Sequence, residues 1–99
     1  RQAAVRYHVP IMTTIQGAVL KEQGYLFAIV IVQPHILDFR DDREAMLAQL
    51  KPLFPGMTVV LMAQDGLARP RWFGPEPIVA ILQGVRPEQI AWKEYTFKD

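Results

Sequence analysis

The side chains best suited to chemistry follow two apolar runs of the chain. Gln33, His35 and Asp38 follow one run, and Gln64 and Asp65 follow the other. Amides, an imidazole and carboxylates form hydrogen bonds and exchange protons, as the polar groups of a ligand pocket do. The competing interpretation is that Gln and Asp at strand ends cap turns and face water. We take these five residues as ligand-binding candidates.

A basic and aromatic segment lies further along the chain. Arg69, Arg71 and Trp72 lie close together, and Arg86 follows later. The first three residues follow within reach of the same strand ends, so they join the ligand-binding set. Guanidinium groups also contact phosphates and indole rings stack on bases, as single-stranded nucleic-acid binders require. The alternative is a short edge strand whose rings pack inward while its arginines face water. The net charge of only +1 provides no basic field, so nucleic acid is a disfavoured partner.

Missing residue types exclude several mechanisms. The chain has no Cys, no Ser and no Asn, which removes thiol and serine nucleophiles, disulfides and thiolate zinc sites. His35 and Asp38 are three positions apart in a predicted loop, and His8 is the one other imidazole, so no metal site is predicted. The glycines are isolated and form no phosphate-binding loop. No catalytic residue and no cofactor are therefore assigned.

The apolar periodicity predicts the elements that must position these side chains. Apolar and polar residues alternate over 3–11, which predicts a strand, and a weaker strand is predicted over 14–20. Residues 26–33 are apolar on both pleat faces, as in a central strand, and residues 58–64 form a second, mostly apolar strand. Asp41 or Asp42 can cap a helix over 42–51 that ends before Pro52. Short strands are predicted over 71–73 and 92–97. A second helix is predicted with prolines in its first turn and its end before Gly84. The alternative for this segment is a strand over 78–82.

Strand, helix and strand over residues 26–64 form a βαβ unit, so its two strands should be parallel with a right-handed crossover. The predicted fold class is α+β: a two-layer sandwich with a mixed sheet of four to six strands, this one parallel unit, and two helices mainly on one face. Residues 1–99 form one domain, in which residues 1–11 are either a leader or a swapped edge strand. Ligands gather beyond the carboxyl ends of parallel strands, so the polar residues should converge there.

The apolar content predicts self-association. Apolar residues make up 51% of the 99 positions, which is high for a domain with a large surface relative to its core. Aromatic residues near the edge elements, among them Trp72, Trp92 and Tyr95, are typical of interface centres. The sequence therefore predicts a binding or interaction module that forms a homodimer, with another protein as a further partner.

The remaining expectations concern membranes and alternative functions. The longest purely apolar run, 26–32, has seven residues, whereas a spanning helix needs about twenty, so no membrane partner is expected and the cytoplasm is the default compartment. The first alternative function is a small-molecule-binding protein or small enzyme that uses the polar residues at the carboxyl ends of the parallel strands. The second is weak binding of single-stranded nucleic acid.

Overall fold

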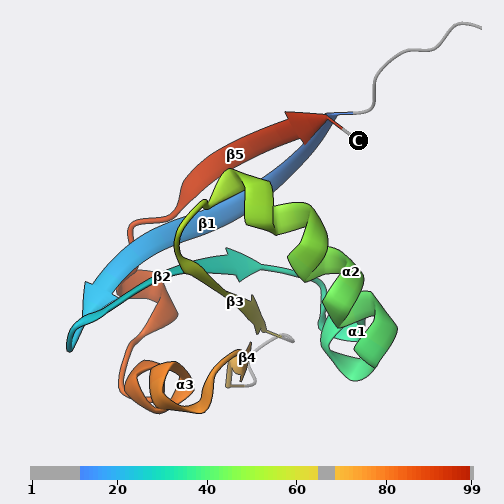
Figure 1. The fold of residues 1–99 in the computed structure, drawn as a ribbon. Helices are drawn as coiled ribbons and strands as arrows, with labels where there is room; N and C mark the ends of the chain where they lie inside the picture. The colour runs from blue at the N-terminus through green and yellow to red at the C-terminus, as the bar shows by residue number, and fades with distance from the viewer. Residues whose placement is uncertain (1–11, 65–68, 99) are drawn as a thin grey trace, which may run out of the picture.

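One mixed sheet organises the computed structural model, which describes residues 12–64 and 69–98 (Figure 1). The order of its five strands is β4-β3-β2-β1-β5. β2 and β3 are parallel, and the other neighbours are antiparallel. The α+β class, the mixed sheet and the parallel unit that the sequence predicts are confirmed. The strands are β1 (Met12–Glu22), β2 (Tyr25–Ile31), β3 (Thr58–Ala63), β4 (Arg71–Phe73) and β5 (Lys93–Lys98).

Helices connect these strands where the sequence predicts them, with one addition. α2 (Arg40–Leu50) and α3 (Glu76–Leu82) are the two predicted helices, so the alternative of a strand over 78–82 is wrong. The addition is α1 (Pro34–Asp38), five residues that were predicted as loop. The proline fixes the first helical φ angle, and the backbone N–H of Ile36 donates to the Gln33 carbonyl at 3.0 Å. The short 3-10 turns η1 (Lys51–Leu53) and η2 (Pro87–Gln89) follow α2 and α3.

The start of α2 corrects the predicted cap. The residue at the cap position is Phe39, and no side chain forms a capping hydrogen bond there. Asp41 and Asp42 lie instead within the first turn of the helix. At that position their negative charge stabilises the positive end of the helix dipole without bonding to its free N–H groups.

Two hydrophobic clusters cover opposite faces of the sheet. On one face Leu50, from α2, packs in a cluster with Leu61 of β3. On the other face Leu82, from α3, packs in a cluster with Val60 of the same strand. The expectation of two helices mainly on one face therefore does not hold for α3. Because β2 and β3 are buried on both pleat faces, each face needs its own cover.

A tight turn joins β1 to β2. Glu22 pairs with Tyr25, and the two residues between them, Gln23 and Gly24, have φ angles of 50° and 86°. Two consecutive positive φ angles are typical of the hairpin turn that matches the twist of the strands. The strand predicted over 14–20 extends over the whole of β1, and the strand predicted over 3–11 lies outside the described residues.

β1 changes partner along its length. It pairs with β5 from Met12 to Gly17 and with β2 from Gly17 onward. A Cβ atom on Gly17 would lie 3.0 Å from the carbonyl oxygen of Ile29 and 3.4 Å from the ring of Tyr95, so glycine permits this crossing. The predicted last strand, β5, is confirmed and forms the outer strand beside β1.

Candidate functional site

The carboxyl ends of β2 and β3 lie side by side. Ile31 pairs with Met62, and the N–H of Val32 donates to the carbonyl of Met62 at 2.8 Å. Gln33 and Gln64 follow these two strand ends, and both residues are exposed. The structure thus brings the two amides to the same end of this pair of strands.

Arg71, the first residue of β4, connects this strand to α1. Its Nη1 donates to Oδ1 of Asp38 and its Nη2 donates to the carbonyl of Pro34, both at 2.9 Å. These contacts hold β4 against α1, and we call the three residues the latch. The side chains of Arg71 and Asp38 are 50% and 51% exposed, so the ion pair contributes modestly to stability.

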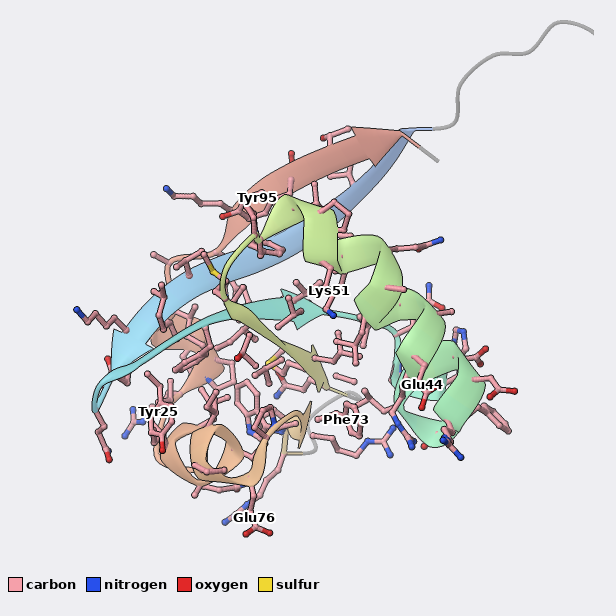
Figure 2. All side chains as sticks on the ribbon, viewed as in Figure 1. Tyr25, Glu44, Lys51, Phe73, Glu76 and Tyr95 are labelled. Atoms are coloured by element: carbon pink, nitrogen blue, oxygen red, sulfur yellow. The ribbon has the colours of Figure 1, made fainter. Side chains whose placement is uncertain are left out.

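A second arginine attaches β4 to the same helices. Nη1 of Arg43 donates to the carbonyl of Leu37 at 2.7 Å. The guanidinium carbon lies 4.6 Å from the ring centroid of Phe73. Phe73, which is labelled in Figure 2, is the last residue of β4. Arg43 was not among the predicted site residues, because nothing in the local sequence pattern links it to a strand so distant along the chain. Its contacts give Arg43 a structural role beside the latch.

His35 and Asp65 are the remaining polar candidates. His35 lies in α1 and is exposed, and Asp65 lies outside the described residues. Neither of the two surface hollows described below is lined by Gln33, His35, Asp38 or Gln64. Among these residues, Asp38 forms the latch together with Arg71.

Trp72 faces the opposite side of the sheet. Successive residues of a strand point to alternate faces, so Arg71 and Phe73 face α1 and α2 while Trp72 packs against the α3 cluster. Beside Trp72 lies a hollow of about 280 Å³, which we call the arginine–tryptophan hollow. Its lining residues are Arg69, Pro70, Trp72, Leu82, Gln83, Val85, Arg86 and Pro87.

The hollow unites residues that the sequence placed in separate segments. Arg69 and Trp72 belong to the predicted ligand-binding set, and Arg86 was noted beside them. Gln83 was missed, because its closeness to Trp72 depends on the packing of α3 against the sheet. Gln83 directly follows the end of α3 at Leu82 and lines the hollow.

Hydrogen bonds between residues close in the sequence position the segment that carries Arg86. The N–H of Val85 donates to the carbonyl of Leu82, and the N–H of Gln89 donates to the carbonyl of Arg86, each at 3.0 Å. The indole Nε1 of Trp92 donates to the carbonyl of Pro87 at 2.9 Å. The chain between α3 and η2 is thus anchored on both sides of Arg86.

Comparisons with protein-family models, curated proteins and solved structures find no match. Function must therefore be inferred from the geometry. Within residues 12–64 and 69–98, no three His, Cys, Asp or Glu side chains gather where they could hold a metal ion. The same residues contain no helix long and apolar enough to cross a membrane.

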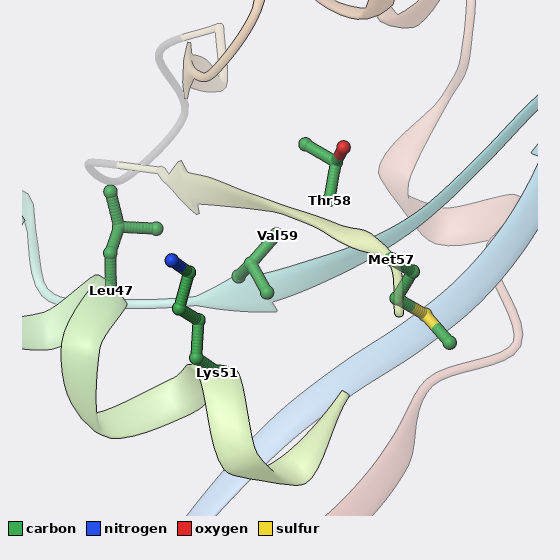
Figure 3. Close-up of a pocket in the computed structure, with 5 residues that line it drawn as sticks. All are labelled: Leu47, Lys51, Met57, Thr58 and Val59. Atoms are coloured by element: carbon green, nitrogen blue, oxygen red, sulfur yellow. The ribbon is translucent and has the colours of Figure 1, made fainter. Parts of the chain in front are cut away.

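A second hollow, of about 300 Å³, lies between the end of α2 and the start of β3 (Figure 3). Figure 3 shows Lys51 extending from the helical side toward β3. This is the one charged residue of the lining, and the wall around it belongs largely to the core cluster under α2. The lining residues are Leu47, Lys51, Met57, Thr58 and Val59. One ammonium group in an apolar wall specifies a ligand poorly compared with the arginine–tryptophan hollow.

Proposed function

We propose that the protein is a binding module for a small anion with one planar ring, which it holds in the arginine–tryptophan hollow. One observation carries the proposal: Arg69, Arg86 and Trp72, from two separate segments, line the same concave surface. Among the residues that the structure describes, the lining contains two guanidinium groups and no carboxylate, so it attracts negative charge.

The chemistry of these groups defines the ligand class. A guanidinium donates paired N–H groups to the oxygens of a carboxylate or a phosphate. An indole face stacks on a planar ring, and stacking on an aromatic side chain contributes about 1–3 kcal/mol per nucleic-acid base. The amide of Gln83 can both donate and accept a hydrogen bond at the rim. A ring and an acidic group on one molecule would engage all of them.

Size and charge favour a small molecule over nucleic acid. The volume of about 280 Å³ is close to the lower end, roughly 300 Å³, of small-molecule sites, and it fits one ring. A single strand needs a basic groove that follows several phosphates, whereas the whole chain has a net charge of +1. The proposed activity is binding without reaction, because a guanidinium does not release its proton and an indole is neither an acid nor a base at neutral pH.

Nuclear magnetic resonance tests the proposal through the indole N–H signals. The chain has two Trp residues, so the Trp72→Phe variant assigns the signal of Trp72. Titration with phenyl phosphate should shift that signal in a saturable way. Inorganic phosphate, which lacks the ring, and phenol, which lacks the charge, should bind at least about tenfold more weakly, because each loses one of the two main contacts.

Matched variants locate the binding. Arg69→Gln and Arg86→Gln should each weaken phenyl phosphate binding about tenfold or more, since a hydrogen bond to a charged group is worth about 1.5–3 kcal/mol. Arg40→Gln removes the same charge from an exposed α2 residue that pairs with Glu44, and it should leave binding unchanged. His35→Ala should also have no effect.

Several outcomes would contradict the proposal. Binding that Arg40→Gln weakens as much as Arg69→Gln would be nonspecific attraction of an anion. Loss of binding in His35→Ala would move the site to the polar edge beside the latch. Tight, steeply salt-dependent binding of an oligothymidine without binding of phenyl phosphate would support the nucleic-acid alternative.

A further inference from the structure

β5 and the first half of β1 form a two-stranded ribbon that extends past the central strands (Figure 1). The β1–β5 pairs run from Met12 with Lys98 to Gly17 with Lys93. The β1–β2 pairs begin only at Gly17. In the described part of the chain, residues 12–16 of β1 therefore pair with β5 alone. Two strands by themselves are marginally stable in water, so the ribbon depends on further contacts.

One face of the ribbon has such contacts. The rings of Tyr95 and Phe54 meet edge to face with centroids 5.0 Å apart, and Ile15 packs against the same cluster. The opposite face is polar and open to solvent, with exposed residues Thr14, Gln16, Glu94 and Thr96. Support thus comes from one side of the ribbon only.

The outer edge of β5 is unpaired within the described residues. β5 is last in the strand order, and all its paired residues belong to β1. Backbone N–H and C=O groups along such an edge can pair with another strand. The opposite edge strand, β4, has three residues, whereas β5 has six, so β5 offers the longer open edge.

We propose that β5 pairs with β5 of a second copy of the chain, antiparallel and about a twofold axis, so that two sheets join into one. A closed twofold pair uses the same surface on both copies and leaves neither β5 edge open. The pairing supplies the ribbon with a third strand, which the described part of its own chain does not provide over residues 12–16.

The charges along β5 select the register. A twofold axis normal to the sheet must pass midway between one residue and its own copy on the other strand. Centred on Thr96, the pairing places Glu94 of each copy opposite Lys98 of the other, which gives two unlike-charge pairs. Centred on Tyr95, it pairs no opposite charges, and centred on Glu94, it opposes two carboxylates. The register centred on Thr96 is therefore the one that we infer.

Charge reversal tests both the edge and the register. Size-exclusion chromatography with light scattering at tens of micromolar should show twice the chain mass of 11.3 kDa. Glu94→Lys and Lys98→Glu should each raise the dimer dissociation constant about tenfold or more, because each places like charges opposite one another twice. The double variant, Glu94→Lys with Lys98→Glu, should restore the dimer. Glu22→Lys changes the same charge at an exposed residue at the far end of β1 and should leave the mass unchanged.

The oligomeric states of the wild type and the variants decide whether β5 pairs with a second copy. A wild-type monomer at these concentrations would overturn the proposal, and so would a dimer that neither single reversal weakens. Restoration in the double variant also shows that the single variants fold, since a misfolded chain would not be rescued by a second charge. The arginine–tryptophan hollow adjoins β4 at the opposite edge of the sheet, so phenyl phosphate binding should be the same in Glu94→Lys. Failure of one proposal is thus distinguishable from failure of the other.

Discussion

The latch between β4 and α1 can be tested by substitutions that remove its contacts singly. Arg71→Met keeps the length of the side chain but removes both donated bonds, to Asp38 and to the carbonyl of Pro34. Asp38→Asn keeps the shape of its side chain and removes only the charge. The two variants therefore separate the ion pair from the bond to the backbone.

The structure sets the size of the expected effect. Two unit charges 2.9 Å apart attract by about 1.4 kcal/mol at the dielectric constant of bulk water. Because both side chains are half exposed, side-chain entropy and screening reduce this to roughly 0.2–1 kcal/mol. The bond to Pro34 adds about 0.5 kcal/mol, the low end for a hydrogen bond, because that contact is exposed too. Asp38→Asn should thus lower the free energy of unfolding by about 0.5 kcal/mol and Arg71→Met by about 1 kcal/mol.

Urea unfolding of the two single variants and the double variant measures these energies. The double variant should be no less stable than Arg71→Met, because the ion pair is already absent in that variant. A loss of about 1 kcal/mol corresponds to a fall in Tm of roughly 4–8 °C for a domain of this size. The Arg40→Met variant is the comparison, because the pair of Arg40 with Glu44 is more exposed and should be worth about 0.5 kcal/mol or less.

A ligand site at the same place would behave differently. Residues held for a ligand often reduce the stability of the protein, so replacing them leaves stability unchanged or raises it. Unchanged or higher stability in both Arg71→Met and Asp38→Asn would refute the latch. That result would return both residues to the ligand-binding set that the sequence predicts.

Two further substitutions test the backbone geometry. Gln23→Gly should raise the free energy of unfolding by about 0.5–1 kcal/mol. A non-glycine residue at φ 50° costs about 1–2 kcal/mol, and part of the gain from removing this cost is offset by the greater chain entropy of glycine in the unfolded state. An unchanged urea midpoint would contradict this prediction. Gly74→Ala should lower it by about 1–3 kcal/mol, because the new Cβ would lie 2.9 Å from Cγ2 of Val60 in the core. The loss from Gly74→Ala should shrink in a Val60→Ala background, and strictly additive losses would exclude the clash as its cause.

The central part of the fold is predictable because it follows from one pattern. Residues of β2 and β3 are apolar on both faces, and this pattern predicts buried parallel strands, which are joined over the sheet by α2. The same pattern implies cover on both faces, yet the two helices were expected mainly on one. α3 lies on the other face, and a Cβ atom on Gly74, shortly before this helix, would lie 2.9 Å from Val60, a closeness that no periodicity reveals. α1 escaped detection because five residues are too short for a helical period.

The candidate site is predictable in its residue types but not in its grouping. The guanidinium and indole groups made Arg69 and Trp72 ligand-binding candidates, and both residues line the hollow. Arg71 lies between them in the sequence but faces the latch, because a strand sends alternate residues to opposite faces. Which residues of this three-residue edge strand face which side of the sheet is set by the pairing of Met62 with Trp72. The sequence does not specify that pairing.

The strand order assigns different roles to the two edges of the sheet. At the β4 edge, Arg71 and Arg43 bind the strand to the helices on one face, while Trp72 and α3 form the hollow on the other. Both faces of β4 are therefore in use, and the strand is short, so this edge is poorly suited to pairing with another chain. β5 has the opposite character, since it is longer, exposed on one face and rich in charges that complement one another across a twofold axis. Three strands separate the two edges, so the proposed ligand and the proposed second copy share no residue.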